Sequence, residues 1–282
     1  MIAIFGGKGY LGRQISHYLT RKGIGVEVFD LPECDVTQAS FWERFEMARY
    51  EAVAYFAGAT GTEAGFAEAD KYLAVNELSL LRLLMKSARL GESAPRIIFP
   101  SSRLVFRGCE RELEENDEKE TKTVYAVNKL ACEGYLQSYY NRFGVPYNVL
   151  RICVPYGSLV KGEYSYGTIG LFLKQIKDKK HVSVYGGGKQ LRTFTHVEDI
   201  CRAVELLIGS NKSGVYNMSG CNMTIADAAK LMAEKCGGAE LRFMDWPKEA
   251  LLIESGSTMF SGNKLANDFS FTNKHKLSEM VL

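Results

Sequence analysis

The stretch IAIFGGKGYLG, residues 2–12, places four glycines within seven positions directly after a short apolar run. Glycine costs backbone entropy, so such a cluster indicates positive φ or a backbone that must approach another group closely. The apolar run Ile2–Phe5 is typical of a buried strand, and a helical pattern begins at Leu11. The glycines therefore form a strand-to-helix turn, where unpaired N–H groups and the helix dipole attract a phosphate group.

The glycine spacing fits a dinucleotide fingerprint in two registers, Gly6-x-x-Gly9-x-x-Gly12 and Gly7-x-Gly9-x-x-Gly12. The next apolar run ends in Asp30, about 20 residues later, where an acidic side chain binds the ribose hydroxyls of NAD. Asp30 would also repel a 2′-phosphate, and the segment DLPECD contains no Lys or Arg. The two features together predict NAD rather than NADP. Taken singly, each also fits an ordinary turn.

The composition predicts a chain that folds without disulfide cross-links. Its 282 residues are 46% hydrophobic, and 35 basic against 33 acidic side chains leave a net charge of +2. This balance predicts no nucleic-acid or membrane surface. The seven cysteines form no C-x-x-C pair, so we expect reduced thiols, no metal site and a cytoplasmic protein.

Strand and helix patterns alternate through the first half of the chain. Such alternation predicts an α/β fold, with a doubly wound parallel sheet and a smaller C-terminal substrate-binding domain. The expected boundaries are 1–154 plus about 195–217 for the dinucleotide-binding Rossmann domain, and 155–194 plus 218–282 for the substrate domain. The expected strands are 2–5, 25–29, 52–56, 96–100 and 147–153, and the expected helices are 11–22, 38–49, 67–90 and 123–143. The acidic run ERELEENDEKE, residues 110–120, is predicted to be a solvated loop.

Three side chains form a candidate catalytic set. Tyr125 and Lys129 stand at i,i+4 on the helix predicted over 123–143, so they share one face. An adjacent ammonium would stabilise a phenolate and lower the tyrosine pKa from about 10. Ser102, at the end of the strand predicted over 96–100, could hydrogen-bond the same substrate hydroxyl. Alone, a Tyr-x-x-x-Lys pair is more often structural, but its place after the glycine turn and Asp30 favours catalysis.

These motifs together resemble the extended short-chain dehydrogenase/reductases of the NAD-dependent epimerase/dehydratase family, which act on nucleotide sugars. The resemblance runs from residue 1 to about 210 and rests on GGKGYLG, FAGAT, PSSRLVF, the Tyr125/Lys129 pair, LRICVPYG and LRTFTHVEDI. It implies cofactor contacts from Gly6, Gly9, Tyr10, Leu11, Gly12, Asp30, Asp35, Val36, Ala57, Gly58, Ala59, Asn76, Tyr125, Lys129 and Pro155. It implies substrate contacts from Ser102, Arg103, Tyr125, Val154 and Arg192, with the Arg192 guanidinium on the nucleotide diphosphate.

The positions at which the sequence departs from the family pattern reduce the number of reactions to be expected. Arg103-Leu104 stand where sugar 4,6-dehydratases carry an Asp-Glu pair, so dehydration lacks its acid and base. Val154 replaces a substrate-contacting asparagine. The sequence favours a nucleotide-sugar epimerase that works through a 4-keto intermediate, and it leaves the sugar and the nucleotide open.

Two alternatives remain beside the epimerase. The short gap from Asp30 to Asp35 and the segment VFRG are similar to nucleotide-sugar 4-keto reductases such as dTDP-4-dehydrorhamnose reductase, which would consume a nicotinamide cofactor. A catalytically silent relative that senses NAD is the other. A homodimer through the helices predicted over 67–90 and 123–143 is a further expectation, although Leu80, Leu83 and Leu84 fit a core stripe equally well.

Overall fold

The structure, a computed structural model, describes residues 1–161 and 166–280. The chain divides into two compact units. The first contains residues 1–105, 120–151 and 201–216, and the second contains 106–119, 152–200 and 217–282. The sequence-based division instead places residues 106–119, 152–154, 195–200 and 217 with the first unit.

A six-stranded sheet forms the centre of the first unit. Its spatial order is β10-β6-β4-β3-β1-β2, and β1 pairs in parallel with β2 and β3, as β3 does with β4. The strands are β1 Ile2–Phe5, β2 Val26–Phe29, β3 Ala52–Tyr55, β4 Arg96–Ser102, β6 Tyr147–Ile152 and β10 Gly214–Asn217. β1, β3 and β6 are buried along their whole length, because helices cover both faces of the sheet.

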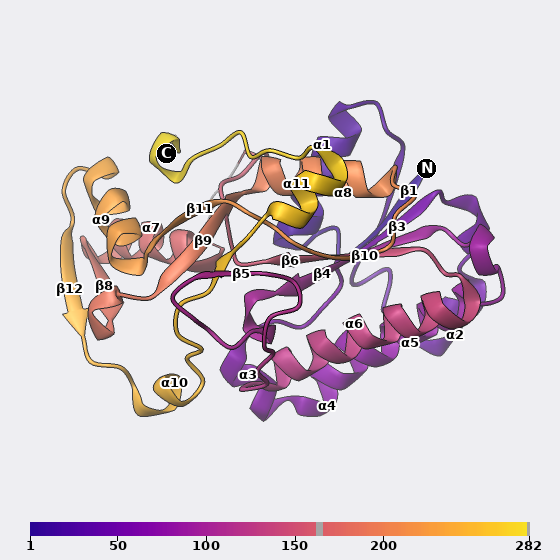
Figure 1. The fold of residues 1–282 in the computed structure, drawn as a ribbon, viewed down its shortest axis with the longest axis horizontal. Coiled ribbons are helices and arrows are strands. Elements are labelled where there is room, and N and C mark those ends of the chain that lie inside the picture. The colour runs from indigo at the N-terminus through magenta and orange to yellow at the C-terminus, as the bar shows by residue number, and fades with distance from the viewer. Residues whose placement is uncertain (162–165, 281–282) are drawn as a thin grey trace. The chain divides into compact units, whose positions relative to one another are not determined.

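Helices lie on both faces of this sheet, with α1 and α8 on one side and α5 and α6 on the other (Figure 1). The α/β fold class predicted from the sequence is therefore confirmed. The helices are α1 Tyr10–Arg21, α2 Ala39–Arg44, α3 Thr62–Ala67, α4 Ala69–Tyr72, α5 Ser79–Ser87, α6 Val124–Phe143 and α8 Val197–Ile208. A π-helical turn, Leu73–Leu78, joins α4 to α5.

An aromatic cluster under β1 shapes one wall of the candidate site. Phe5 is fully buried and stacks on Phe29 and Trp42 at ring-centroid distances of 4.9 and 5.3 Å. The Trp42 indole donates to the Val36 carbonyl at 2.8 Å. Such aromatic pairs contribute about 0.5–1.5 kcal/mol each beyond their buried area. The cluster therefore fixes the short segment before α2 against the end of the sheet.

The second unit is a mixed assembly of short sheets and helices. β9 lies between β11 and β7, antiparallel to β11 and parallel to β7, while β12 pairs with β8 and β13 with β5. The strands are β5 Glu112–Leu113, β7 Val154–Tyr156, β8 His181–Tyr185, β9 Leu191–His196, β11 Cys221–Thr224, β12 Glu240–Met244 and β13 Met259–Phe260. The helices are α7 Gly167–Lys179, α9 Ile225–Lys235, α10 Lys248–Leu252 and α11 Asn263–Phe269.

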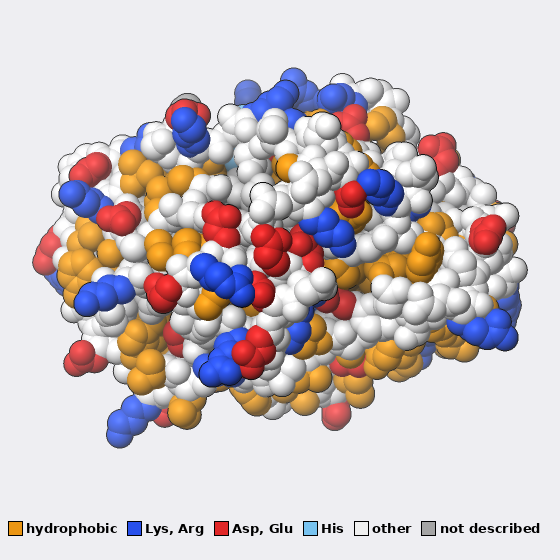
Figure 2. Space-filling model, in the orientation of Figure 1, with side chains coloured by type: hydrophobic (Ala, Val, Ile, Leu, Met, Phe, Trp, Pro, Cys, Tyr) orange, Lys and Arg blue, Asp and Glu red, His pale blue; other side chains and the backbone are white. Residues whose placement is uncertain are grey.

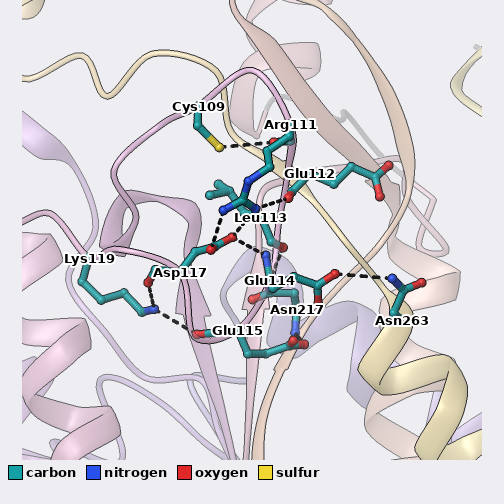
Figure 3. Close-up of polar contacts among 10 residues, drawn as sticks. All are labelled: Cys109, Arg111, Glu112, Leu113, Glu114, Glu115, Asp117, Lys119, Asn217 and Asn263. Carbon is teal, nitrogen blue, oxygen red and sulfur yellow. Dashed lines mark hydrogen bonds and ion pairs between the residues drawn. The ribbon is translucent and has the colours of Figure 1, made fainter.

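The acidic run at 110–120 is more ordered than the sequence predicts. Leu113 is buried in β5, and Glu115 is buried with its carboxylate accepting the backbone N–H of Asn217 at 2.8 Å. Arg111 binds Asp117 through two hydrogen bonds of 2.7 Å (Figure 3). The expected solvated loop is therefore wrong for its central residues, because strand pairing and internal ion pairs hold them within the second unit.

The distribution of charged side chains and the hydropathy of the helices were compared with what the composition predicts. Acidic and basic side chains are interspersed on the face drawn in Figure 2, as the near-zero balance of charges predicts. Within residues 1–161 and 166–280, no helix combines the length and the apolar character that crossing a membrane requires.

Candidate functional site

The glycine turn between β1 and α1 is sterically closed to larger residues. Gly6 has φ +72°, and a Cβ there would lie 2.6 Å from the Ala57 nitrogen. A Cβ at Gly12 would lie 2.2 Å from the Gly6 carbonyl oxygen. Gly9 forms the N-cap of α1 without a side-chain cap. The turn thus places the backbone of three segments in contact and leaves N–H groups at the start of a long helix.

A cavity of about 380 Å³ opens beside this turn. Its volume falls within the range of small-molecule sites, about 300–1,000 Å³. Of the predicted cofactor residues, Gly6, Gly9, Asp30, Asp35, Val36, Ala57 and Gly58 line it. The sequence reasoning did not name the other lining residues, Lys8, Phe29, Leu31, Cys34, Thr37, Phe56 and Val75. The cavity thus collects residues from the ends of β1, β2 and β3, where a parallel sheet binds its ligands.

Asp30 accepts the backbone N–H of Lys8 through Oδ2 at 2.7 Å and that of Leu31 through Oδ1 at 2.8 Å. The Lys8 ammonium reaches the Leu31 carbonyl at 2.9 Å and Glu33 at 2.6 Å. The sequence argument against a 2′-phosphate had considered cations only within DLPECD, and it missed this lysine in the glycine turn. Glu33 offsets the charge of the Lys8 ammonium, so the Asp30 carboxylate still makes this part of the cavity wall negative.

Hydrogen bonds hold Asp35, another residue that lines the cavity. Its Oδ1 accepts the Thr37 hydroxyl at 2.7 Å and the Thr37 N–H at 2.9 Å. These hydrogen bonds hold the pKa of Asp35 below its usual range. The carboxylate is therefore ionised at neutral pH and available as an acceptor for an adenine amino group or a hydroxyl.

Asn76 connects the segment after β3 to helix α6. Its side chain accepts the Ala59 N–H at 2.8 Å and donates to the Ala59 carbonyl at 3.1 Å and to Asn128 at 3.2 Å. Asn76 and Glu77 lie buried in the π-helical turn, and Asn128 donates to Glu77 at 2.5 Å. π-Helical turns often occur at functional sites because they re-aim side chains. Here the turn ties the segment after β3 to α6.

Lys129 is buried on α6 beneath the end of β4. Its ammonium donates to the Pro100 carbonyl at 2.7 Å and lies 4.4 Å from the centre of the Phe99 ring. The same ammonium lies 5.5 Å from the centre of the Tyr125 ring. Burial lowers the pKa of Lys129 to about 8. The lysine is thus mostly charged at neutral pH, as a group that stabilises a neighbouring phenolate must be.

Tyr125 and Ser102 occupy element ends next to this lysine. Tyr125 is half-buried in the first turn of α6, where Thr123 caps the helix by accepting the Ala126 N–H at 3.1 Å. Ser102 is half-buried as the last residue of β4, and its hydroxyl accepts the Leu104 N–H at 3.3 Å. The first unit therefore holds all three candidate catalytic residues and the cavity.

A buried ion pair that the sequence analysis did not identify supports β4 from below. Glu133 receives the Ser101 hydroxyl at 2.6 Å and the Arg151 guanidinium at 2.9 and 2.5 Å. Glu133 stands four residues after Lys129, on the same face of α6. This i,i+4 spacing is the sequence signal that could have indicated Glu133. The pair fixes α6 against β4 and β6.

The remaining predicted site residues have varied surroundings. Arg103 follows β4 in the first unit, while Val154, Pro155 and Arg192 belong to the second unit. Val154 is buried in β7 opposite Phe194. Arg192 is buried, donating to Glu254 at 2.6 Å and to the Gly256 carbonyl at 2.5 Å. Tyr10, Leu11, Gly12, Ala59 and Asn76 adjoin the lining residues without being among them.

These features fit an NAD cofactor. The contacts that a Cβ would make at Gly6 and Gly12 show a backbone packed as a phosphate cradle needs, and Asp30 and Asp35 offer acceptors on the cavity wall. Gly6, Gly9 and the first turn of α1 would hold the pyrophosphate, and Asp30 the adenosine ribose.

Comparison with known proteins identifies the relatives of the chain. The sequence model of the NAD dependent epimerase/dehydratase family matches residues 2–219. The mouse (Mus musculus) dTDP-D-glucose 4,6-dehydratase is 25% identical over 189 residues, which are 66% of this chain and 52% of that protein. The chain thus spans about half the length of this mammalian relative. The dTDP-L-rhamnose 4-epimerase of Burkholderia thailandensis is 24% identical, covering 85% of this chain and 82% of that protein.

Solved structures share the fold at lower identity. The Thermus thermophilus UDP-glucose 4-epimerase in complex with NAD superposes with a TM-score of 0.86 at 23% identity, over 99% of this chain and 95% of that one. The dTDP-glucose 4,6-dehydratase DesIV of Streptomyces venezuelae gives 0.84 at 19%, over 98% and 92%. These likenesses support the Rossmann fold, and the family's description agrees with the NAD prediction.

Proposed function

The chain belongs to the NAD dependent epimerase/dehydratase family, and from this premise we propose that it is a nucleotide-sugar epimerase acting through a 4-keto intermediate. The observation that carries the proposal is the buried Lys129 ammonium 5.5 Å from the Tyr125 ring, in the unit that contains the dinucleotide cavity. Relatives with 4-epimerase activity match most of this chain, as the Burkholderia protein does.

Each catalytic residue has a defined task in this reaction. NAD, held by the glycine turn and Asp30, would supply the acceptor for the hydride of the sugar carbinol and the donor for the reduction of the ketone. Tyr125 removes the hydroxyl proton as the ketone forms and gives it back afterwards. The Lys129 ammonium stabilises the phenolate, and the Ser102 hydroxyl hydrogen-bonds the same sugar oxygen. Protons and electrons balance over the cycle, so no cofactor is consumed.

The residues after β4 argue against a dehydratase. Arg103 and Leu104 stand where sugar 4,6-dehydratases carry an acidic pair, and elimination of water needs an acid and a base beside the leaving hydroxyl. A guanidinium stays protonated at every working pH, so Arg103 cannot remove a proton.

The nucleotide diphosphate is assigned to Arg192 by the family resemblance. Its guanidinium already binds Glu254 and the Gly256 carbonyl, so this role requires a diphosphate to replace the carboxylate as its partner. A guanidinium fork suits both groups, since each presents paired oxygens.

The proposal is tested by incubating the purified protein with UDP- and dTDP-hexoses without added nicotinamide and following the sugar protons by NMR. We expect interconversion of the two C4 epimers and co-purifying NAD in the mass spectrum. Turnover that requires stoichiometric NADH or NADPH would instead show the 4-keto reductase.

The matched control for this assay is a pair of Tyr→Phe variants on α6. Tyr125→Phe removes the acid/base group, and we expect a loss of at least about 10³-fold in kcat, which combines proton transfer with phenolate positioning. Tyr140→Phe, on an exposed position of the same helix, should retain full activity. Unchanged epimerisation in Tyr125→Phe contradicts the mechanism.

We also propose that two copies of the chain associate through α5 and α6. Leu80, Leu83 and Leu84 are fully buried, so they belong to the core and cannot form this interface. The most exposed apolar residues of the two helices are instead Met85 and Val127, at 61% and 46%. Sedimentation of the wild type as a dimer, and of Met85→Glu as a monomer, is the expected result. A wild-type monomer at micromolar concentration would remove the proposal.

A further inference from the structure

Two histidines and a glutamate meet in the second unit, in a cluster that the proposed reaction does not use. His196 is the last residue of β9, Glu198 lies in the first turn of α8, and His275 belongs to the segment after α11. All three side chains are half-buried, and one donor atom from each lies within 4.8 Å of the other two. The chain has four histidines, so half of them are in this cluster.

The contacts within the cluster bring the donor atoms to ligand-like separations. His275 Nε2 lies 3.3 Å from Glu198 Oε2. The imidazoles of His196 and His275 lie against each other, with ring centroids 4.3 Å apart and planes inclined by 34°. A cation held between the two imidazoles and the carboxylate would bridge all three side chains.

The backbone holds the three residues in place independently of their side chains. Asp199 is buried, and its carboxylate accepts the backbone N–H groups of Lys274 and His275 at 3.0–3.1 Å. On the other side, Gly157 has φ +87°, and a Cβ there would lie 2.4 Å from His196 Nε2. The Asp199 carboxylate thus fixes the backbone at His275, and the lack of a side chain at Gly157 leaves room for the His196 ring.

We propose that His196, Glu198 and His275 bind one divalent transition-metal ion of the zinc class. Two imidazoles and one carboxylate suit Zn²⁺, Co²⁺ or Ni²⁺, and they are too few in oxygen for Ca²⁺ or Mg²⁺. Three protein ligands leave at least one coordination position for water.

The hydrogen bonding and the surroundings of the donors bear on this site. His196 Nδ1 accepts the Glu198 N–H at 3.2 Å, a long contact that a metal on this nitrogen would replace. Lys274 and Lys276 flank His275 and are exposed, so their charge should limit the affinity to the micromolar range.

The test is a titration of the full chain, freed of any histidine tag, with CoCl₂ at pH 7.5. We expect one equivalent to bind with a micromolar Kd and to produce visible d–d absorption bands, which Zn²⁺ abolishes by competition. His275→Ala and the isosteric Glu198→Gln should each weaken binding at least about tenfold, since each removes one of three ligands. Circular dichroism shows whether the variants remain folded.

The two other histidines supply the control. His17→Ala/His181→Ala leaves the cluster intact, so this double variant should bind Co²⁺ like the wild type. Absence of a one-to-one complex, or unchanged Kd in both folded variants His275→Ala and Glu198→Gln, would overturn the site. So would loss of binding in the control, which would locate the metal elsewhere. The titration involves neither NAD nor sugar, so its outcome is independent of the proposed epimerase.

Discussion

Lys129 shows how one buried residue would link stability to the proposed catalysis. Its pKa is lowered to about 8 from 10.5 by burial, while the unfolded chain keeps the ordinary value. Between these two pH values the unfolded state binds more protons, so the folded state gains stability as pH rises through this window. Below pH 8, the buried charge imposes its full cost on the fold.

Replacing this lysine tests the cost directly. At pH 7, Lys129→Met should raise the free energy of unfolding by on the order of 2 kcal/mol, because it removes a desolvated charge. The gain should shrink towards pH 10 in urea titrations, while Lys230→Met, an exposed substitution on α9, shows no such trend. A pH-independent loss of stability in Lys129→Met would contradict the burial argument.

The same titration should appear in the rate. As pH rises past about 8, Lys129 loses its proton and the phenolate loses its counter-charge, so kcat/KM should fall with an apparent pKa near 8. Lys129→Arg keeps a charge at all working pH values, so any remaining activity should lack this alkaline limb. A limb unchanged in Lys129→Arg would assign the pKa to another group.

The glycine turn is the element on which the cofactor site depends. Gly12→Ala would place a Cβ 2.2 Å from the Gly6 carbonyl, so we expect the turn to shift, the fold to lose stability and NAD binding to fall at least about tenfold. Gly134→Ala on α6 is the matched control, since nothing lies within 4 Å of its Cβ. It should stabilise the protein by about 0.5–1 kcal/mol. NAD affinity unchanged in Gly12→Ala contradicts the cradle.

Elements defined by local signals were predictable from the sequence. The helix expected over 123–143 is observed as Val124–Phe143 behind its Thr123 cap. The helix expected over 67–90 is observed as a continuous helical run from Ala69 to Ser87, but its middle, Leu73–Leu78, is π-helical where Asn76 and Glu77 bond distant partners. Periodicity cannot report such contacts.

The same limit applies to the site. Asp30, Tyr125 and Lys129 follow from spacing along single elements, so the sequence could indicate them. Lys8 beside Glu33, and Arg192 on Glu254, depend on pairings between distant segments. The acidic run at 110–120 was misjudged for this reason, since β13 pairs with it from about residue 259.

At the scale of the whole molecule, cofactor binding should stabilise the fold. A ligand that binds only the folded state adds about 2.7 kcal/mol at a concentration of 100 Kd. The cavity lies within the first unit, so we expect NAD to raise its unfolding temperature in calorimetry. NADP should raise it less, because Asp30 lines the cavity where the adenosine ribose is expected and would repel a 2′-phosphate. Equal shifts with both dinucleotides would contradict the assigned role of Asp30.

The most direct measurement of the central claim is a crystal structure of the protein with NAD. The account predicts the pyrophosphate on the glycine turn and the Tyr125 hydroxyl beside the nicotinamide ribose, at a hydrogen-bond distance of about 2.6–3.2 Å. A dinucleotide bound elsewhere, or a Tyr125 hydroxyl remote from the nicotinamide, would contradict it.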